Sequence, residues 1–340
     1  MSGTSISRSA VLMCALLFFV SGCGERSGAP GSDEFPLLEG DYIGQMPPGT
    51  EPQVFAQGII SDPMNNRDVA ISPDGDEIYF GLSNAGVVTI IYSKRVDGRW
   101  TPPEVAPFAT DPNIYDFEPC ISPDGEIFMF LSNRAPEGRE SAQGWTYQNI
   151  WAMDRRETGW SEPYDLGEPI NTDAAEFFPS LTNDGTLYFT RGTGGEYYIY
   201  RSRLTDGGYS EPEKLGHGVN AGTAQYNAFI AADESYLICL ATGREENIGI
   251  ADYYISFRNE DDTWAGPINM GDKINRPGAT GASPYVTRDG RYLFFSSTKP
   301  LGDDVTLSYD LIKHLYYEPQ NGSPDIYWVD AAFIEELRPR

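Results

Sequence analysis

The sequence predicts an all-β protein: a five-bladed β-propeller built from four-stranded antiparallel blades. A hairpin-like stretch recurs five times along the chain, and strand-like stretches follow each copy. The composition agrees, because 21 Tyr, 17 Phe and 6 Trp, with 36 Gly and 25 Pro, favour short strands separated by turns over long helices. A chain of 340 residues with 40% hydrophobic content is long enough to bury a large core.

The recurring stretch has the pattern of a strand, a tight turn and a second strand. In its first copy, NRDVAISPDGDEIYF (66–80), an Asp-Gly pair separates two apolar runs. Asp-Gly is a strong hairpin signal because glycine accepts the positive φ of a primed turn. The other copies are DFEPCISPDGEIFMF (116–130), EFFPSLTNDGTLYFT (176–190), QYNAFIAADESYLIC (225–239) and GASPYVTRDGRYLFF (281–295). The fourth copy has Asp233-Glu234 in place of Asp-Gly, which predicts a looser turn there.

Further strands follow each hairpin and complete a blade. The third strands are predicted at IIYSKR (90–95), NIWAMDRR (149–156), YIYRSRL (198–204), DYYISFR (252–258) and DIYWVD (325–330). The fourth strands are predicted at RWTPPEVA (99–106), GWSEPYDLG (159–167), GYSEPEKLG (208–216) and TWAGPINMG (263–271). Four strands in roughly 50 to 60 residues is the blade unit of a propeller.

The fifth repeat has no fourth strand after it. The segment TEPQVFAQG (50–58), before the first hairpin, has the pattern of the missing strand. We therefore expect this N-terminal strand to complete the last blade and close the ring, which leaves no open edge. The predicted organisation is a signal peptide at 1–22, an acylated cysteine and flexible tether at 23–48, and a single propeller domain at 49–335.

The first residues have the pattern of an export signal. Arg8 precedes the apolar run AVLMCALLFFV (10–20), which is too short to span a bilayer. The following VSGC resembles the lipobox of bacterial lipoproteins, which implies cleavage before Cys23 and acylation of that residue. The alternative is an ordinary secretory signal. Gly24, rather than Asp, follows the cysteine, which by resemblance to the sorting rules of enteric lipoproteins implies the outer membrane. We therefore expect a lipid-anchored protein of the cell envelope that faces either the periplasm or the outside.

Charge and cysteine content exclude several classes of protein. A formal net charge of −26 without any Lys/Arg run argues against a nucleic-acid partner, since phosphates would be repelled. Cys120 and Cys239 are the cysteines of the predicted domain, and both lie in apolar strand runs of repeats that are not neighbours. Buried unpaired thiols are expected rather than a disulfide, and no Cys-x-x-Cys pair indicates zinc.

The turns carry a family resemblance. Ser72-Pro73-Asp74-Gly75 and Ser122-Pro123-Asp124-Gly125, with the variants at 183–185 and 288–290, resemble the repeats of the TolB-like, WD-like propeller family. The resemblance covers residues 50 to 330. It is specific for the fold and leaves the function open, because such propellers serve as periplasmic scaffolds, peptidase-associated domains and polysaccharide-acting enzymes alike. Many relatives have six or seven blades, whereas five hairpins are found here.

Charged residues are predicted at the end of the ring opposite the turns. First strands start there and second strands end there, around the central channel. Alignment of the five copies places polar residues at the starts of the first strands: Asp68, Asp116, Glu118, Glu176 and Asn227. It places basic residues at the ends of the second strands: Arg134, Arg191, Arg244 and Lys299. Such a funnel suits a sugar, a peptide end or a small charged ligand. The alternative is that each arginine pairs with a nearby carboxylate and only holds loops together.

Two long insertions, 135–149 and 300–324, follow second strands and could roof this face or pack as a satellite core. The second insertion contains His314, the better of two histidine candidates for a ligand-binding role. A two-carboxylate hydrolase could use Glu118 and Glu176, and a lyase could use His314 as its base. No cofactor is predicted. Calcium at Asp116, Glu118 or the run 171–176 has no diagnostic spacing.

The sequence therefore predicts an envelope-anchored binding or scaffolding module that recognises a glycan, a peptide or a protein partner at the central-channel face. The alternative is a polysaccharide-active enzyme, a lyase or glycoside hydrolase, with its site in the same funnel. A third interpretation is a structural partner in a complex, which would present an apolar patch on the side of the ring or on the turn face.

Overall fold

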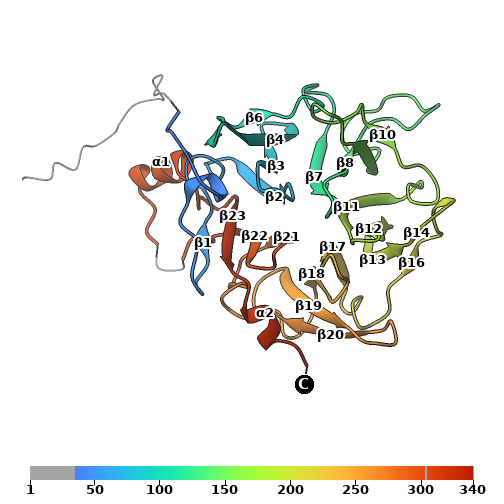
Figure 1. The fold of residues 1–340 in the computed structure, drawn as a ribbon. Helices are drawn as coiled ribbons and strands as arrows, with labels where there is room; N and C mark the ends of the chain where they lie inside the picture. The colour runs from blue at the N-terminus through green and yellow to red at the C-terminus, as the bar shows by residue number, and fades with distance from the viewer. Residues whose placement is uncertain (1–34, 303–304, 340) are drawn as a thin grey trace, which may run out of the picture. The chain divides into compact units, whose positions relative to one another are not determined.

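Five antiparallel sheets, four of them with four strands and one with five, surround a common axis in the computed structural model (Figure 1). The prediction of an all-β, five-bladed propeller is confirmed. The structure describes residues 35–302 and 305–339. The predicted signal peptide, Cys23 and residues 24–34 of the predicted tether lie outside these residues. From Leu37 on, the described chain forms one compact unit.

Each blade runs from an inner strand at the axis to an outer strand at the rim. Blade 1 comprises β2 (Asn65–Ile71), β3 (Glu77–Asn84), β4 (Val87–Val96), β5 (Arg99–Trp100) and β6 (Glu104–Val105). Blade 2 comprises β7 (Asp116–Ile121), β8 (Ile127–Ser132), β9 (Asn149–Asp154) and β10 (Tyr164–Asp165). Blade 3 comprises β11 (Ala175–Leu181), β12 (Leu187–Thr193), β13 (Glu196–Ser202) and β16 (Glu213–Lys214), with the small hairpin β14 (Leu204–Thr205) and β15 (Gly208–Tyr209) beside it.

The last two blades follow the same plan. Blade 4 comprises β17 (Ala224–Ile230), β18 (Tyr236–Thr242), β19 (Asp252–Arg258) and β20 (Trp264–Asn269). Blade 5 comprises β21 (Gly281–Val286), β22 (Tyr292–Thr298), β23 (Pro324–Asp330) and the N-terminal strand β1 (Gln53–Val54). In that blade Gln53 lies opposite Trp328 and Val54 opposite Tyr327. Blade 5 thus contains strands from both ends of the propeller unit.

The apolar core lies between blades. Each of the five buried clusters joins residues of two adjacent blades; one of them, for example, packs Tyr79 of blade 1 against Phe128 of blade 2 at a ring-centroid distance of 4.9 Å. Phe55 and Trp328, both with 0% exposed surface, belong to the cluster between blades 5 and 1. The hairpin repeats in the sequence because each blade buries both its faces only against neighbours.

The turn residues explain the recurring Ser-Pro-Asp-Gly sequence. In the second turn the Ser122 hydroxyl donates to Asp124 Oδ1 at 2.5 Å, while Ser122 Oγ accepts from the backbone N–H of Ile127 at 2.9 Å. This hydrogen bond from Ser122 holds the pKa of Asp124 below its usual value. The serine and aspartate therefore fix the turn with side-chain hydrogen bonds that glycine alone does not provide.

The fourth turn is as tight as the others, so the prediction of a looser turn is wrong. The backbone N–H of Glu234 donates to Ala231 O at 2.8 Å, the same length as the bond from Gly125 to Ser122 in the second turn. Glu234 adopts a φ of 58°, in the left-handed region that glycine usually occupies. Its side chain is bound to its surroundings, as described below, and this compensates for the backbone conformation.

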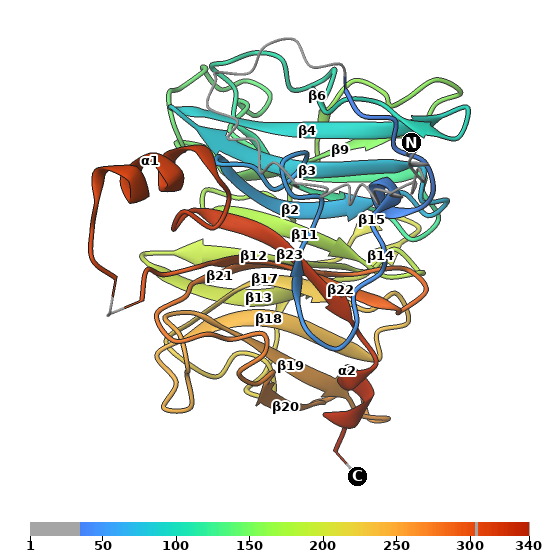
Figure 2. The same ribbon diagram turned by 90° about the vertical axis from the view of Figure 1, so that its left-hand side faces the viewer.

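The second insertion contains a helix that the sequence did not predict. Helix α1 (Tyr309–Tyr317) begins at Ser308, whose side chain accepts from the backbone N–H of Leu311, and none of its residues is buried. Figure 2 shows α1 on the side of the ring away from the C-terminal helix α2 (Phe333–Glu336). Because its side chains stay exposed, α1 does not form the core of a satellite domain. A short 3₁₀ helix, η1 (Tyr42–Gly44), precedes β1.

Both cysteines of the described chain are free thiols, as predicted. Burial raises the pKa of Cys120 and of Cys239 to about 12, so neither is a thiolate near neutral pH. Across the described ranges, the helices found are too short or too polar to cross a membrane.

Candidate functional site

A β-bulge occurs in every inner strand at the level of the predicted site residues. The ladder register shifts there in β2, β7, β11, β17 and β21. The bulged residues Asp68, Glu118, Phe178 and Asn227 all have a positive φ, between 52° and 62°. A bulge re-aims side chains. In a regular strand, side chains alternate between the two faces of the sheet. The bulge breaks this alternation, so sequence periodicity alone could not show which way these side chains point.

The bulged residues bond to the next blade. Glu118 Oε2 accepts from the backbone N–H of Phe178 at 2.8 Å, and the side-chain amide of Asn227 donates to Ala282 O. Glu118 is 6% exposed and Asn227 is 3% exposed. These side chains therefore link successive inner strands around the axis, and part of their hydrogen-bonding capacity is used in holding the ring together.

One guanidinium group joins two of the predicted carboxyl groups. Arg67 Nε lies 2.8 Å from Asp68 Oδ1 and 2.9 Å from Oδ2, and Arg67 Nη2 lies 3.1 Å from Glu118 Oε1. Burial raises the pKa of Asp68 and raises that of Glu118 to about 8, although Arg67 opposes both shifts. Since one guanidinium neutralises one carboxylate, the second carboxyl group favours its protonated form near neutral pH.

Two carboxylate and arginine pairs lie at the end of the ring away from the turns. Arg134 binds Asp116 through both terminal nitrogens, and its Nη2 donates to Asp116 Oδ2 at 2.9 Å. Arg191 Nε donates to Glu176 Oε1 at 2.8 Å from the directly opposite position of the neighbouring strand. Burial raises the pKa of both Asp116 and Glu176, while the arginines lower it. These contacts correspond to the structural alternative, in which each arginine neutralises the carboxylate of its own blade.

The remaining predicted residues are spread over separate loops. Arg244 Nε donates to Glu246 Oε1 at 2.9 Å, and the Arg244 guanidinium lies over the Tyr254 ring. Lys299 Nζ donates to Gln320 Oε1 at 2.6 Å. His314 is exposed on α1. No hydrogen bond or ion pair within the described chain joins these three residues to the cluster of Arg67, Asp68 and Glu118.

A cavity of about 500 Å³ lies at the turn end of the axis, and inner strands of all five blades contribute to it. Its walls are apolar and aromatic, and they include Ile71, Ile121, Leu181, Phe178, Phe229, Tyr236 and Tyr285. Its rim carries turn residues, among them Pro73, Pro123, Asn183, Asp233, Arg288 and Asp289. Among the predicted site residues, Glu118 lines this channel cavity. The concave space described here therefore opens among the turns, whereas the candidate residues were expected at the opposite end.

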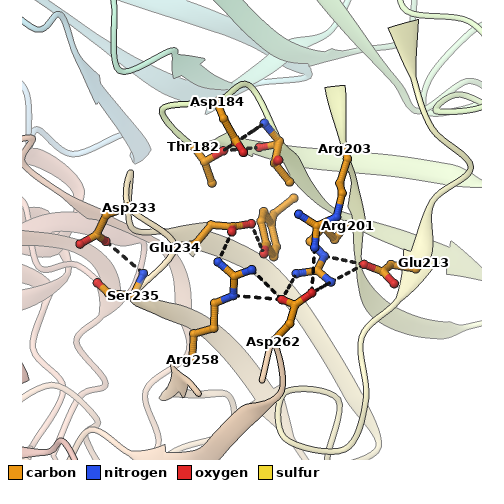
Figure 3. Close-up of polar contacts among 12 residues, drawn as sticks. Thr182, Asp184, Arg201, Arg203, Glu213, Asp233, Glu234, Ser235, Arg258 and Asp262 are labelled. Atoms are coloured by element: carbon orange, nitrogen blue, oxygen red, sulfur yellow. Dashed lines mark hydrogen bonds and ion pairs between the residues drawn. The ribbon is translucent and has the colours of Figure 1, made fainter. Parts of the chain in front are cut away.

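The rim between blades 3 and 4 is held by a balanced ion network (Figure 3). Asp262 Oδ1 accepts from Arg201 at 2.8 Å and from Arg258 at 2.6 Å, and Asp262 Oδ2 accepts from Arg203 at 2.8 Å. Glu234 of the fourth turn pairs with Arg258 and accepts from the Tyr188 hydroxyl. These arginines already have carboxylate partners, so the network joins two blades rather than offering free charge to a ligand.

Two features of the site were missed in the sequence. Arg67 occupies the aligned position at which blades 2, 3 and 4 have Phe117, Phe177 and Tyr226, and a charge among aromatic residues was the available signal. The apolar residues before each turn were used only to align the five repeats, so they were not recognised as walls of a cavity. Within the described chain no group of three His, Cys, Asp or Glu residues is placed to hold a metal ion.

Comparisons with known proteins show similarity in fold. No family model and no curated protein sequence matches this chain. Among solved structures, TolB from Acinetobacter baumannii is 16% identical with a TM-score of 0.45 over 79% of this chain, which spans 57% of that protein. A putative TolB from Agrobacterium tumefaciens is 15% identical with a TM-score of 0.46, over 79% of this chain and 91% of that one. The GH62 α-L-arabinofuranosidase domain of Coprinopsis cinerea is 10% identical with a TM-score of 0.49, over 84% and 98%. At these values the similarities carry no argument about activity.

Proposed function

We propose that the protein is a binding or scaffolding module of the cell envelope that takes part of a glycan, a peptide or a protein partner into the channel cavity. The cavity of about 500 Å³ at the turn end is the observation that supports this proposal. Its aromatic walls offer apolar contact area, and Glu118 provides a carboxyl group at its inner end. Pockets with mostly apolar walls and a few polar groups are typical ligand sites.

The charged pairs at the opposite end support the same choice. The carboxyl groups of Asp116 and Glu176 each have an arginine partner and almost no exposed surface. A ligand that bound there would have to replace these ion pairs, which is costly for buried charges. Arg288, in contrast, lines the rim of the channel cavity and has no ion-pair partner in the described chain.

Membrane attachment through acylated Cys23, at the outer membrane, belongs to the same proposal. Its support is the VSGC sequence after the apolar run of the leader. We also propose that the N-terminal strand closes the ring; the support is the pairing of β1 with β23. No metal or other cofactor has a role in this proposal.

A polysaccharide-active enzyme is the second candidate. It is favoured by the raised pKa of Glu118, because a carboxyl group that keeps its proton near neutral pH can serve as a general acid. Asp68, joined to Glu118 through Arg67, would supply the second carboxyl group of a hydrolase. A lyase with His314 as its base would place the chemistry on α1 instead.

Incubation of the purified protein with acidic and neutral polysaccharides tests both candidates. Thermal stabilisation without new reducing ends or absorbance at 235 nm would support a binding module, and product formation would identify an enzyme. Arg288→Ala removes a rim cation without an ion pair, so we expect an unchanged fold and binding weakened about ten-fold. Arg134→Ala tests the opposite end of the ring. Binding that is lost only in Arg134→Ala would contradict the assignment to the channel cavity.

A further inference from the structure

A second concave surface lies along the outer edge of blade 5, away from the channel cavity. It is a groove of about 780 Å³ between the N-terminal segment and the loops that precede β21 and follow β22. Its lining includes Leu38, Gln53, Gln57, Ile59, Arg276 and Lys299. This surface is called the blade 5 groove below.

The groove contains two cations that have no carboxylate partner. In the described chain, the cations that form no ion pair are Lys94, Lys214, Arg276, Arg288 and Lys299. Arg276 and Lys299 line the same groove although they come from different loops. In a chain with 50 acidic and 24 basic residues, most cations are expected to find a carboxylate. Two unpaired cations in one groove therefore leave positive charge available for a ligand.

The groove is also free of acidic lining residues. The channel cavity is lined by Glu118, Asp233, Asp289 and Glu335 besides Arg288, whereas the lining of the blade 5 groove includes no Asp or Glu. The carboxylate that acts on Lys299, Asp325, is 1% exposed, and its Oδ2 accepts from the backbone N–H of Gln320 at 2.7 Å. The groove is thus a local positive site on a protein whose overall charge would repel anions.

Neutral polar groups line the same groove as the two cations. The side-chain amides of Gln53 and Gln57 line the groove and make no hydrogen bond within the described chain, so both can donate to and accept from a ligand. Tyr327 is 2% exposed, its hydroxyl has no hydrogen-bond partner among the described residues, and the Arg276 guanidinium lies 4.8 Å from its ring centroid. Cations recognise a carboxylate, and free amides recognise hydroxyl groups.

We propose that the blade 5 groove binds a carbohydrate that carries a carboxylate, with Arg276 and Lys299 on the carboxylate and Gln53 and Gln57 on the hydroxyl groups. Arginine can hold a carboxylate through two parallel N–H bonds, and lysine contributes a flexible charge. The partly exposed apolar side chains of Leu38 and Ile59 in the same lining offer contact area to the face of a sugar ring. This site is separate from the channel cavity and does not depend on the proposal made for it.

Isothermal titration calorimetry of the purified protein with tri-galacturonate tests the proposal. Saturable binding is expected, and Arg276→Gln and Lys299→Ala should each weaken it about ten-fold, since each removes a charge-assisted hydrogen bond. Lys94→Ala is the matched control, because Lys94 is also an exposed lysine without an ion pair but lies on blade 1. Binding should be unchanged in Lys94→Ala.

Maltotriose and inorganic phosphate serve as comparison ligands. Maltotriose should not bind measurably, because it lacks the carboxylate. Phosphate binding as tight as that of tri-galacturonate would overturn the assignment to a carbohydrate. No binding of tri-galacturonate, or equal binding in wild type, Arg276→Gln and Lys299→Ala, would overturn the site. Circular dichroism of each variant separates a lost site from a lost fold.

Discussion

Buried ionisable residues give the ring a pH-dependent stability that is visible at the scale of single side chains. Asp325 on β23 is 1% exposed, and burial raises its pKa from 3.8 to about 6. A carboxyl group with a raised pKa in the folded state binds its proton more tightly there than in the unfolded chain. Its contribution to stability is therefore complete below about pH 4 and is lost as the pH rises through about 6.

Asp325→Asn should remove this pH dependence. A shift from 3.8 to about 6 corresponds to about 3 kcal/mol. We expect the free energy of unfolding of Asp325→Asn, relative to the wild type, to increase by up to about 3 kcal/mol between pH 4 and pH 7. Urea unfolding of both proteins at several pH values measures it. Parallel stability profiles across this range would contradict the assignment of the shift to Asp325.

The contacts of single side chains were the features that the sequence predicted least well. Aligned repeats placed Asp68 and Glu118 at equivalent positions of neighbouring blades, and the structure brings both to one guanidinium group. The bridging residue, Arg67, could not be assigned, because side-chain direction in a bulge does not follow the two-residue period of a strand. Pairing of Arg134 and Arg191 with carboxylates of their own blades was foreseen as an alternative.

At the scale of elements, the fourth turn shows that a missing glycine can be compensated by tertiary contacts. Glu234 holds a φ of 58°, and its carboxylate accepts from the Tyr188 hydroxyl at 2.8 Å and pairs with Arg258. Hairpins were predictable because alternating apolar residues around Asp-Gly are local signals. The tightness of this turn was not, because it depends on a partner 46 residues away in the sequence.

Glu234→Gly should therefore destabilise the protein, although it relieves the backbone. Relief of the left-handed conformation is worth roughly 1 kcal/mol. Loss of the Glu234 side chain removes the acceptor of the buried Tyr188 hydroxyl and leaves Arg258 with Asp262 as its carboxylate partner, at a cost of about 3 kcal/mol. We expect a net loss of about 2 kcal/mol in urea unfolding. In a double-mutant cycle with Tyr188→Phe, the double variant should lose less unfolding free energy than the sum of the two single losses. Full additivity would show that the contact between Glu234 and Tyr188 contributes nothing.

Helix α1 illustrates the other limit of prediction at this scale. Its nine residues carry exposed Tyr309, Tyr316 and Tyr317, and the Ser308 side chain accepts at its first turn. The chain is rich in tyrosine, which favours β-strands, so the tyrosines of this insertion did not indicate a helix. The cap and the i, i+3 pair of Asp310 and Lys313 were the local signals that could have revealed it.

At the scale of the whole molecule, one sheet combines strands from distant parts of the chain, since β1 pairs with β23. Phe55, directly after β1, has 0% exposed surface. Its ring centroid lies 4.9 Å from that of Phe294 and 5.2 Å from that of Trp328. Its backbone N–H donates to Ile326 O at 2.8 Å. The strand β1 and the adjacent Phe55 thus contribute edge pairing and aromatic packing to blade 5.

Phe55→Ala separates this joining role from ordinary core packing. We expect a loss of about 3 to 5 kcal/mol in unfolding free energy, as for other large buried side chains. The matched control Phe128→Ala should lose about as much, since Phe128 also has 0% exposed surface but lies in blade 2.

The two variants should differ in hydrogen exchange. If β1 closes the ring, Phe55→Ala weakens its attachment to β23, so the backbone amides of residues 326–328 exchange faster in that variant alone. The uncovered edge of β23 is also expected to promote self-association, measured by sedimentation velocity. Equal protection of β23 in the two variants would contradict the proposed role of Phe55 in holding β1 against β23.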